Sequence, residues 1–190
     1  MSTKTRLTLE EFLSMPETEP PSEYICGEVV QKVAPSWNHG LLVLEIGAML
    51  RDYLRKSGEG FVNTELRHAA RTEQRVYLPD VNVTLRQRAP RAPEQRRRGP
   101  IEVPPDIAIE VLSPDDAASR VLEKVDFYLR SGVRLVWLVD PDLETITVYR
   151  QGEAPRTHRA PETIDASPVL RDFHLDLAEL FAALHAGEED

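Results

Sequence analysis

The stretch PPDIAIEVLSP, residues 104–114, constrains the fold more than any other part of the chain. In an extended strand, Ile107, Ile109 and Val111 would lie on one face and Glu110 on the other. The stretch is so apolar that we expect this strand in the interior of a sheet. Burying an unpaired carboxylate costs several kcal/mol or raises its pKa, so Glu110 needs a partner.

A second carboxylate is the first candidate partner for Glu110. Asp106 shares its strand face, but four residues of strand separate the two by about 13 Å, too far for one metal ion. Opposed side chains on adjacent strands lie only about 5 Å apart, and the stretch LPDVNVTL offers Asp80 directly after Pro79. Two carboxylates that close repel each other unless a cation is present. Because Mg²⁺ is held by one or two carboxylates together with water and substrate oxygens, Asp80 and Glu110 are the candidate metal ligands.

The pattern of apolar and turn residues along the chain predicts a single domain over residues 1–190. Helical spacing, caps and glycine stops predict helices at 8–15, 36–56, 115–131 and 176–185. Alternation predicts hairpins at 23–34 and 134–152 and strands at 60–70, 74–85 and 106–112. This order is typical of an α/β or α+β domain with a central mixed sheet flanked by helices. No glycine-rich loop follows a strand, which argues against a dinucleotide-binding or P-loop enzyme.

The charge of the chain is strongly asymmetric. Its formal net charge of −9 argues, taken alone, against non-specific binding of nucleic acid. The proline-rich segment 86–100 nevertheless contains Arg86, Arg88, Arg91, Arg96, Arg97 and Arg98. Its prolines predict an irregular, exposed loop through most of its length. Two interpretations stay open, a solvated loop that keeps the protein in solution and an arm that contacts nucleic-acid phosphates. The acidic C-terminus, 186–190, is predicted to be a solvated tail.

Several classes of protein are not expected. No apolar run approaches the length of a membrane span, and the N-terminus has no signal-peptide pattern. Cys26 is the only cysteine, so a disulfide framework is excluded. These features together lead us to expect a cytoplasmic protein.

Lys124 is the candidate catalytic cation. It falls at the edge of the apolar stripe of the helix predicted at 115–131, and the chain contains only four lysines. The alternatives are a surface pair with Glu123 or an alkyl stem packed along Tyr128. Structural alternatives also stay open for the two acids. Glu110 would then form a buried pair with an arginine, and Asp80 would be an ordinary turn acid.

Three further residues are candidates for the same site, without an assigned catalytic role. Glu28 follows the predicted hairpin turn at Gly27, and His39 lies near the start of the helix predicted at 36–56. His39 has the alternative of a core position. Glu45 lies between apolar positions on the same helix, where an acid is unusual.

Five stretches carry a resemblance to a known family. They are EYICGEVV, WNHGLLVLEIGAML, LPDVNV, PPDIAIEVLSP and EKVDFYLRSGVRLVWLVDP. In order and spacing they resemble the Uma2-like (DUF820) family of bacterial restriction-endonuclease-like proteins, within the PD-(D/E)XK nuclease superfamily. The resemblance extends over about residues 7–181. It implies a restriction-endonuclease-like core, with a mixed sheet between helices.

The resemblance also implies a metal-dependent nuclease, with DNA as the expected substrate and possible homodimers by analogy. Asp80 and Glu110 match the two acids of the superfamily, which would hold Mg²⁺ or Mn²⁺. The superfamily lysine would fall on Leu112, so this chain departs from the pattern there. In Uma2-like sequences the lysine lies on the following helix, which points to Lys124. The alternative is a catalytically inactive protein that keeps the nuclease fold and binds nucleic acid or another partner.

Overall fold

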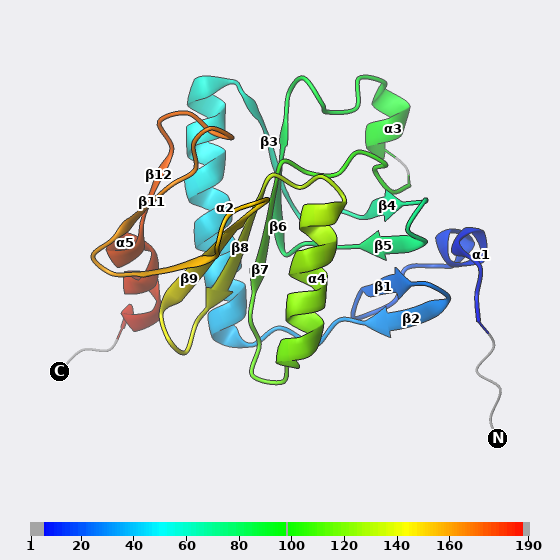
Figure 1. Ribbon diagram of the computed structural model, residues 1–190, viewed down its shortest axis with the longest axis horizontal. Helices are drawn as coiled ribbons and strands as arrows, with labels where there is room; N and C mark the ends of the chain where they lie inside the picture. The colour runs from blue at the N-terminus through cyan, green and yellow to red at the C-terminus, as the bar shows by residue number, and fades with distance from the viewer. Residues whose placement is uncertain (1–5, 98, 188–190) are drawn as a thin grey trace.

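The computed structural model describes residues 6–97 and 99–187. Arg98 and residues 188–190 of the predicted acidic tail lie outside this part of the chain. A six-stranded mixed sheet forms the centre of the molecule (Figure 1). Its strands, in spatial order, are β10 (Arg156–Arg159), β9 (Thr145–Arg150), β8 (Leu135–Asp140), β7 (Ile107–Val111), β6 (Val81–Leu85) and β3 (Gly60–Thr64). The pair β7 and β8 is parallel, whereas the other pairs are antiparallel. This arrangement confirms the predicted fold class.

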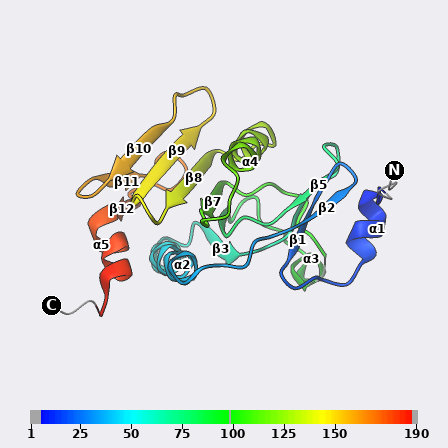
Figure 2. The same ribbon diagram turned by 90° about the horizontal axis from the view of Figure 1, so that it is seen from below.

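Helices cover both faces of the central sheet. Figure 2 shows α2 (Trp37–Ser57) and α4 (Ala118–Arg130) on opposite sides of β7. Ile107, Ile109 and Val111 belong to the large core on the α2 side, together with Leu42 and Ile46 of that helix. Ala108, in contrast, packs with residues of α4 on the other side. All five residues of β7 are buried, because the strand has a helix over each face.

A second sheet lies beside the first. Its four strands are β2 (Glu28–Gln31), β1 (Ser22–Ile25), β5 (Arg75–Tyr77) and β4 (His68–Ala70). The short helix α1 (Leu9–Ser14) packs on it through Leu9 and Phe12. The hairpin of β1 and β2 turns at Cys26 and Gly27, as predicted, and both residues have positive φ.

Two predicted strands are each divided between the two sheets, which corrects the expectation for 60–70 and 74–85. The first becomes β3 and β4, and the second becomes β5 and β6. Between β5 and β6 the chain leaves one sheet and enters the other through Leu78, Pro79 and Asp80. Proline has no backbone N–H to donate to a sheet, so an interruption of the strand is expected at Pro79. It leaves Asp80 at the junction of the two sheets.

The two long helices have different starts. Ser36 caps α2 by accepting a hydrogen bond from the His39 N–H at 3.2 Å, and Gly58 ends the helix with a φ of 70°. The helix predicted from residue 115 begins later, at Ala118, because Asp116 instead accepts a hydrogen bond from the Ser113 N–H at 2.8 Å. This turn links β7 directly to α4.

The arginine-rich segment is more ordered than predicted. Residues Pro93–Arg97 form a short helix, α3, because proline is tolerated in the first turn of a helix. Three short strands were also not predicted, namely β10, β11 (Thr163–Asp165) and β12 (His174–Asp176). The last helix, α5 (Leu177–Ala182), is followed by a 3₁₀ turn, Ala183–His185. Within the described residues, no helix is long and apolar enough to span a membrane.

Candidate functional site

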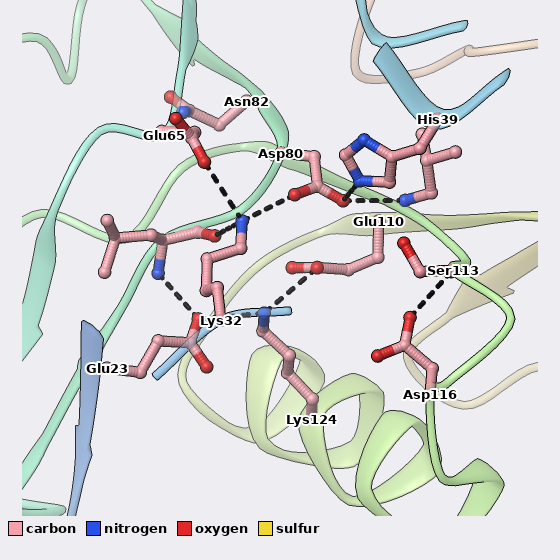
Figure 3. A network of polar contacts seen from close by, with 12 residues as sticks. Glu23, Lys32, His39, Glu65, Asp80, Asn82, Glu110, Ser113, Asp116 and Lys124 are labelled. Atoms are coloured by element: carbon pink, nitrogen blue, oxygen red, sulfur yellow. Dashed lines mark hydrogen bonds and ion pairs between the residues drawn. The ribbon is translucent and has the colours of Figure 1, made fainter. Parts of the chain in front are cut away.

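The register of β6 and β7 determines where the two candidate metal ligands lie. Val81 pairs with Ile109 in the antiparallel ladder. The next residue outward is Asp80 on one strand and Glu110 on the other. The structure therefore brings the two carboxylates to facing positions at the same end of the sheet (Figure 3). Both residues are buried, with exposed fractions of 3% and 7%.

Asp80 is held by donors from three directions. Its Oδ1 lies 2.5 Å from Lys32 Nζ. Its Oδ2 accepts a hydrogen bond of 2.8 Å from the Val111 N–H and lies 3.2 Å from His39 Nε2. Burial alone would raise the pKa of Asp80. The hydrogen bond from His39 and the charges of Lys32 and Lys124 outweigh it, so the pKa lies well below its ordinary value.

Glu110 is held by the helix that covers its face of the sheet. Lys124 Nζ lies 3.0 Å from Oε2, and the Tyr128 hydroxyl donates to Oε1 at 2.5 Å. Burial raises the pKa of Glu110, Lys124 opposes this shift, and the neighbouring Asp80 carboxylate adds to it. Glu110 is therefore a carboxyl group whose ionised form is costly in this site unless further positive charge is present.

Two residues of the hairpin complete the cluster, and sequence reasoning missed both. Glu23 of β1 accepts one hydrogen bond from the Leu78 N–H at 2.9 Å and forms an ion pair with Lys124 at 2.8 Å. Lys32 follows β2 and also donates to the Leu78 carbonyl at 3.1 Å. The scarcity of lysine could have identified Lys32, since two of the four lysines in the chain lie in this cluster.

The carboxylates raise the pKa of both lysines despite burial. For Lys124 the opposing charges belong to Glu110, Glu23 and Asp80, and for Lys32 they belong to Asp80 and Glu110. Both ammonium groups are consequently charged at neutral pH. The surface pair considered for Lys124 does not form, because Glu123 pairs with Arg75. The arginine considered as a structural partner of Glu110 is likewise not among the contacts of Glu110.

The cluster opens into a cavity of about 290 Å³ between the hairpin and α4. Its wall includes Asp80, Glu110, Lys124, Lys32, Glu23 and His39. Of the further candidates, His39 contacts Asp80, and Glu28 lines the cavity without contacting either metal-ligand candidate. Glu45 is not among the lining residues. Leu112, at the position where the superfamily has its lysine, lies on the wall, and Lys124 reaches Glu110 from the helix instead.

The donor set suits a hard divalent cation. Such an ion prefers oxygen ligands and is often held by one or two carboxylates, with water and phosphate oxygens completing its shell. Asp80 and Glu110 supply these oxygens on the wall of one cavity. In the described residues, no group of three His, Cys, Asp or Glu side chains is arranged as a ready-made metal site. Lys32 and Lys124 instead provide the positive charge beside the two carboxylates, so an ion would have to share these oxygens with them.

The described arginines of segment 86–100 do not line this cavity. Arg86, Arg91 and Arg96 line a separate hollow at the opposite end of the central sheet. Arg88 is not part of a free arm, because it pairs with the buried Asp106 at 2.8 Å. Asp106 also accepts a hydrogen bond from the Leu85 N–H at 2.8 Å, in keeping with a structural role at the start of β7. Arg97 lies exposed on α3.

Comparison with known proteins identifies the family. The family Uma2, described as "Putative restriction endonuclease", matches residues 9–178. Among solved structures, the chain is similar to a "putative nuclease belonging to DUF820" from Anabaena variabilis ATCC 29413. The two are 31% identical with a TM-score of 0.83, over 94% of this chain and 99% of that one. No curated protein matches the chain. A restriction-endonuclease-like fold, a buried pair of facing carboxylates and this match over most of the sequence lead to one conclusion: the chain belongs to the Uma2 family.

Proposed function

We propose that this protein is a metal-dependent nuclease that hydrolyses phosphodiester bonds of DNA. One observation carries the proposal, namely that Asp80 and Glu110 face each other on a cavity wall with Lys124 3.0 Å from Glu110. Restriction-endonuclease-like nucleases generally use divalent metals, and the family membership supports nuclease chemistry. Asp80 and Glu110 would hold Mg²⁺ or Mn²⁺. When bound, such an ion supplies Lewis-acid polarisation of the phosphate and a lowered pKa for a coordinated water.

The residues of the chain have distinct roles in this proposal. The Lys124 ammonium donates to the attacking water or to the negative charge that develops on the phosphate. Glu23 positions that ammonium from the hairpin side, 2.8 Å away. Tyr128 fixes one oxygen of Glu110 at 2.5 Å and so limits the rotation of the carboxylate. Lys32 and His39 keep Asp80 ionised.

The decisive experiment measures cleavage of labelled duplex DNA with Mg²⁺, with Mn²⁺ and with excess chelator. We expect cleavage only with metal, and a loss of at least about 100-fold in rate for Glu110→Gln, as for removal of an essential group. Glu153→Gln is the matched control, because Glu153 is an exposed acid in the turn after β9. It should retain the wild-type rate.

Metal binding is measured separately, by calorimetric titration with Mn²⁺. We expect weaker binding for Asp80→Asn and Glu110→Gln and unchanged binding for Glu153→Gln. Melting temperatures show whether each variant is folded. The proposal is wrong if the folded wild-type protein cleaves no DNA and if Glu110→Gln binds Mn²⁺ as well as the wild type does.

One observation favours a second function. All four carboxylate oxygens of Asp80 and Glu110 already accept a hydrogen bond from the protein, and Lys32 and Lys124 supply two of the four donors. Together with Leu112 at the superfamily lysine position, this suits a protein that keeps the nuclease fold without the reaction and binds nucleic acid. Absence of cleavage, together with affinity for DNA in the presence of chelator, would support this function.

A further inference from the structure

Five arginines from three separate parts of the chain line one hollow of about 810 Å³, which we call the arginine hollow. They are Arg86, Arg91, Arg96, Arg134 and Arg171. Arg134 precedes β8, and Arg171 lies in the connection between β11 and β12. The hollow lies at the end of the sheet where β6 ends and β8 begins, away from Asp80. In Figure 1, α3 is drawn at the top of the molecule, whereas the loop from β7 to α4 is at the bottom.

The positive charge in the arginine hollow is largely uncompensated. Among the described residues, Glu59 is the only acid on its wall, and this carboxylate accepts a hydrogen bond from the Tyr53 hydroxyl at 2.6 Å. Arg134 is 3.6 Å from Asp106, which already pairs with Arg88. In the described residues, the other four arginines of the hollow form no ion pair with a carboxylate. A group of unpaired guanidiniums on a protein of net charge −9 is an unusual concentration of positive potential.

Two of these guanidiniums are held in place. The Cζ atoms of Arg86 and Arg96 lie 5.1 and 5.3 Å from the centroid of the same ring, that of Phe61. Each also donates its Nε–H to a backbone carbonyl at 2.6 Å, Arg86 to Gly58 and Arg96 to Pro90. A guanidinium has five N–H donors, so four remain on each side chain for a ligand. The cation–π contacts and Nε bonds preorganise both groups and lower the entropic cost of binding an anion.

We propose that the arginine hollow is a second phosphate-binding site, which takes the backbone of a nucleic acid. Guanidinium groups match phosphate oxygens with two parallel hydrogen bonds. Exposed arginines spread over several segments suit a chain of phosphates better than a single small anion, because each contact is individually weak. The inference does not depend on the reaction proposed for Asp80 and Glu110.

The distance between the two sites sets a length requirement on the nucleic acid. Asp80 and Arg86 are six residues apart along β6, which corresponds to about 20 Å of strand. Duplex DNA rises about 3.4 Å per base pair, so about six base pairs are the least that could span both sites. Duplexes shorter than this can occupy only one site at a time. Affinity should therefore rise when the duplex becomes long enough to reach both.

The test measures fluorescence anisotropy of a labelled duplex of about 30 base pairs, with chelator present so that no strand is cut. The variant is Arg91→Gln with Arg171→Gln, because neither side chain has a described structural contact. The control is Arg51→Gln with Arg159→Gln, which removes the same charge from exposed positions outside the hollow.

We expect the hollow variant to bind the duplex at least about 10-fold more weakly than the wild type. The slope of log affinity against log salt should fall by about 2, since each phosphate contact contributes about 0.9. The control should stay within about 2-fold of wild type at the same salt, and melting temperatures should match. Equal affinity and salt slope for the hollow variant and the control would overturn the proposal.

Two further measurements identify the source of the phosphate and test the arginine hollow independently of the proposed nuclease activity. If inorganic phosphate or a mononucleotide binds through Arg91 and Arg171 while the long duplex does not, the ligand is a small phosphate compound and our assignment is wrong. Glu110→Gln should keep hollow-dependent binding of the duplex. Absence of cleavage by the wild-type protein with Mg²⁺ or Mn²⁺, together with such binding, would refute the nuclease and leave the arginine hollow intact as a nucleic-acid site.

Discussion

The Oδ2 atom of Asp80 accepts a hydrogen bond of 2.8 Å from the backbone N–H of Val111, the residue that follows Glu110. This bond joins the start of β6 to the end of β7 just beyond the last paired residues, Val81 and Ile109. Strand ends otherwise lose hydrogen-bond partners, so the bond fixes the backbones that carry the two carboxylates. Asp80 is thus a structural residue of the sheet as well as a candidate metal ligand.

The ion pair of Lys32 and Asp80 should contribute measurably to stability. In Lys32→Met, the buried Asp80 carboxylate loses the ammonium 2.5 Å away, and we expect the free energy of unfolding to fall by roughly 1–3 kcal/mol. Lys56→Met is the control, because Lys56 is exposed in the last turn of α2 and should change stability by about 0.5 kcal/mol or less. Urea unfolding at neutral pH measures both. Equal stability of the two variants would show that Asp80 does not need this partner.

Trp37 should report occupancy of the cavity by nucleic acid. The ring is 85% exposed, and it lines a hollow that shares Leu112 and Ser113 with the Asp80–Glu110 cavity. Trp137, the other tryptophan, is fully buried. A base that stacks on Trp37 should quench its emission, and removal of the ring should weaken binding by roughly 1–3 kcal/mol.

The measurement is tryptophan fluorescence during titration with a single-stranded oligonucleotide in chelator. Trp37→Phe retains only the buried Trp137 and should show no quenching. Saturating binding to the wild type with unchanged emission would mean that no base stacks on this ring.

His68 should make stability depend on pH. Burial lowers the pKa of His68, whose Nδ1 lies 2.9 Å from the Val103 carbonyl and whose ring stacks on Tyr77. The unfolded chain takes up a proton as the pH falls through about 6.5, whereas the folded protein resists protonation until lower pH. The stabilisation is therefore complete above about pH 6.5 and decreases as the pH falls toward the lowered pKa.

Unfolding by urea at several pH values between about 5 and 8 checks this expectation. In His68→Gln, the free energy of unfolding should fall less steeply toward acid pH. The slope should decrease by at most about 1.4 kcal/mol per pH unit, the contribution of a single proton. His174→Gln, at an exposed position, should leave the slope unchanged. A wild-type slope in the His68 variant would assign the pH dependence to other groups.

Gly60 should be intolerant of a side chain. A Cβ at this position would lie 2.7 Å from the Thr84 carbonyl oxygen and 3.2 Å from the Leu85 Cα on the paired strand. Gly60→Ala therefore has to displace the β3–β6 ladder, and we expect a loss of about 1–3 kcal/mol in the free energy of unfolding. At Gly47, within α2, nothing lies within 4 Å of the added atom, so Gly47→Ala should stabilise by up to about 1 kcal/mol. The same direction of change in both variants would contradict this account.

The central sheet could be predicted because its information is local. Ile107, Ile109 and Val111 alternate along one strand, and the helical spacing around Lys124 places that residue toward the sheet. The need of a buried Glu110 for a partner on an adjacent strand related it to Asp80, and the family resemblance agreed. Each of these features depends on residues close together in the sequence or on the pairing of two strands, so one sequence is enough to predict it.

The rest of the site depends on how distant segments dock. Glu23 and Lys32 belong to a hairpin whose alternation indicates strands but not which sheet they join. The division of residues 74–85 at Pro79 was readable from the proline, yet the destination of each half was not. The position of the arginines was also hidden, because Arg134 and Arg171 reach the same hollow from far along the chain.

The hairpin of β1 and β2 forms a wall of the cavity separate from the one that carries Asp80 and Glu110. Asp80, Glu110 and Lys124 belong to the central sheet and its helix, whereas Glu23 and Lys32 come from or directly follow strands of the smaller sheet. Two ion pairs of the cluster, Lys32–Asp80 and Lys124–Glu23, thus join the two parts, whereas Lys124–Glu110 lies within the central sheet and its helix. Local opening of the hairpin would withdraw one acid and one ammonium together and would leave the net charge of the remaining group unchanged. Evolution or design could therefore vary the hairpin wall of the cavity while Asp80 and Glu110 stay fixed on the sheet.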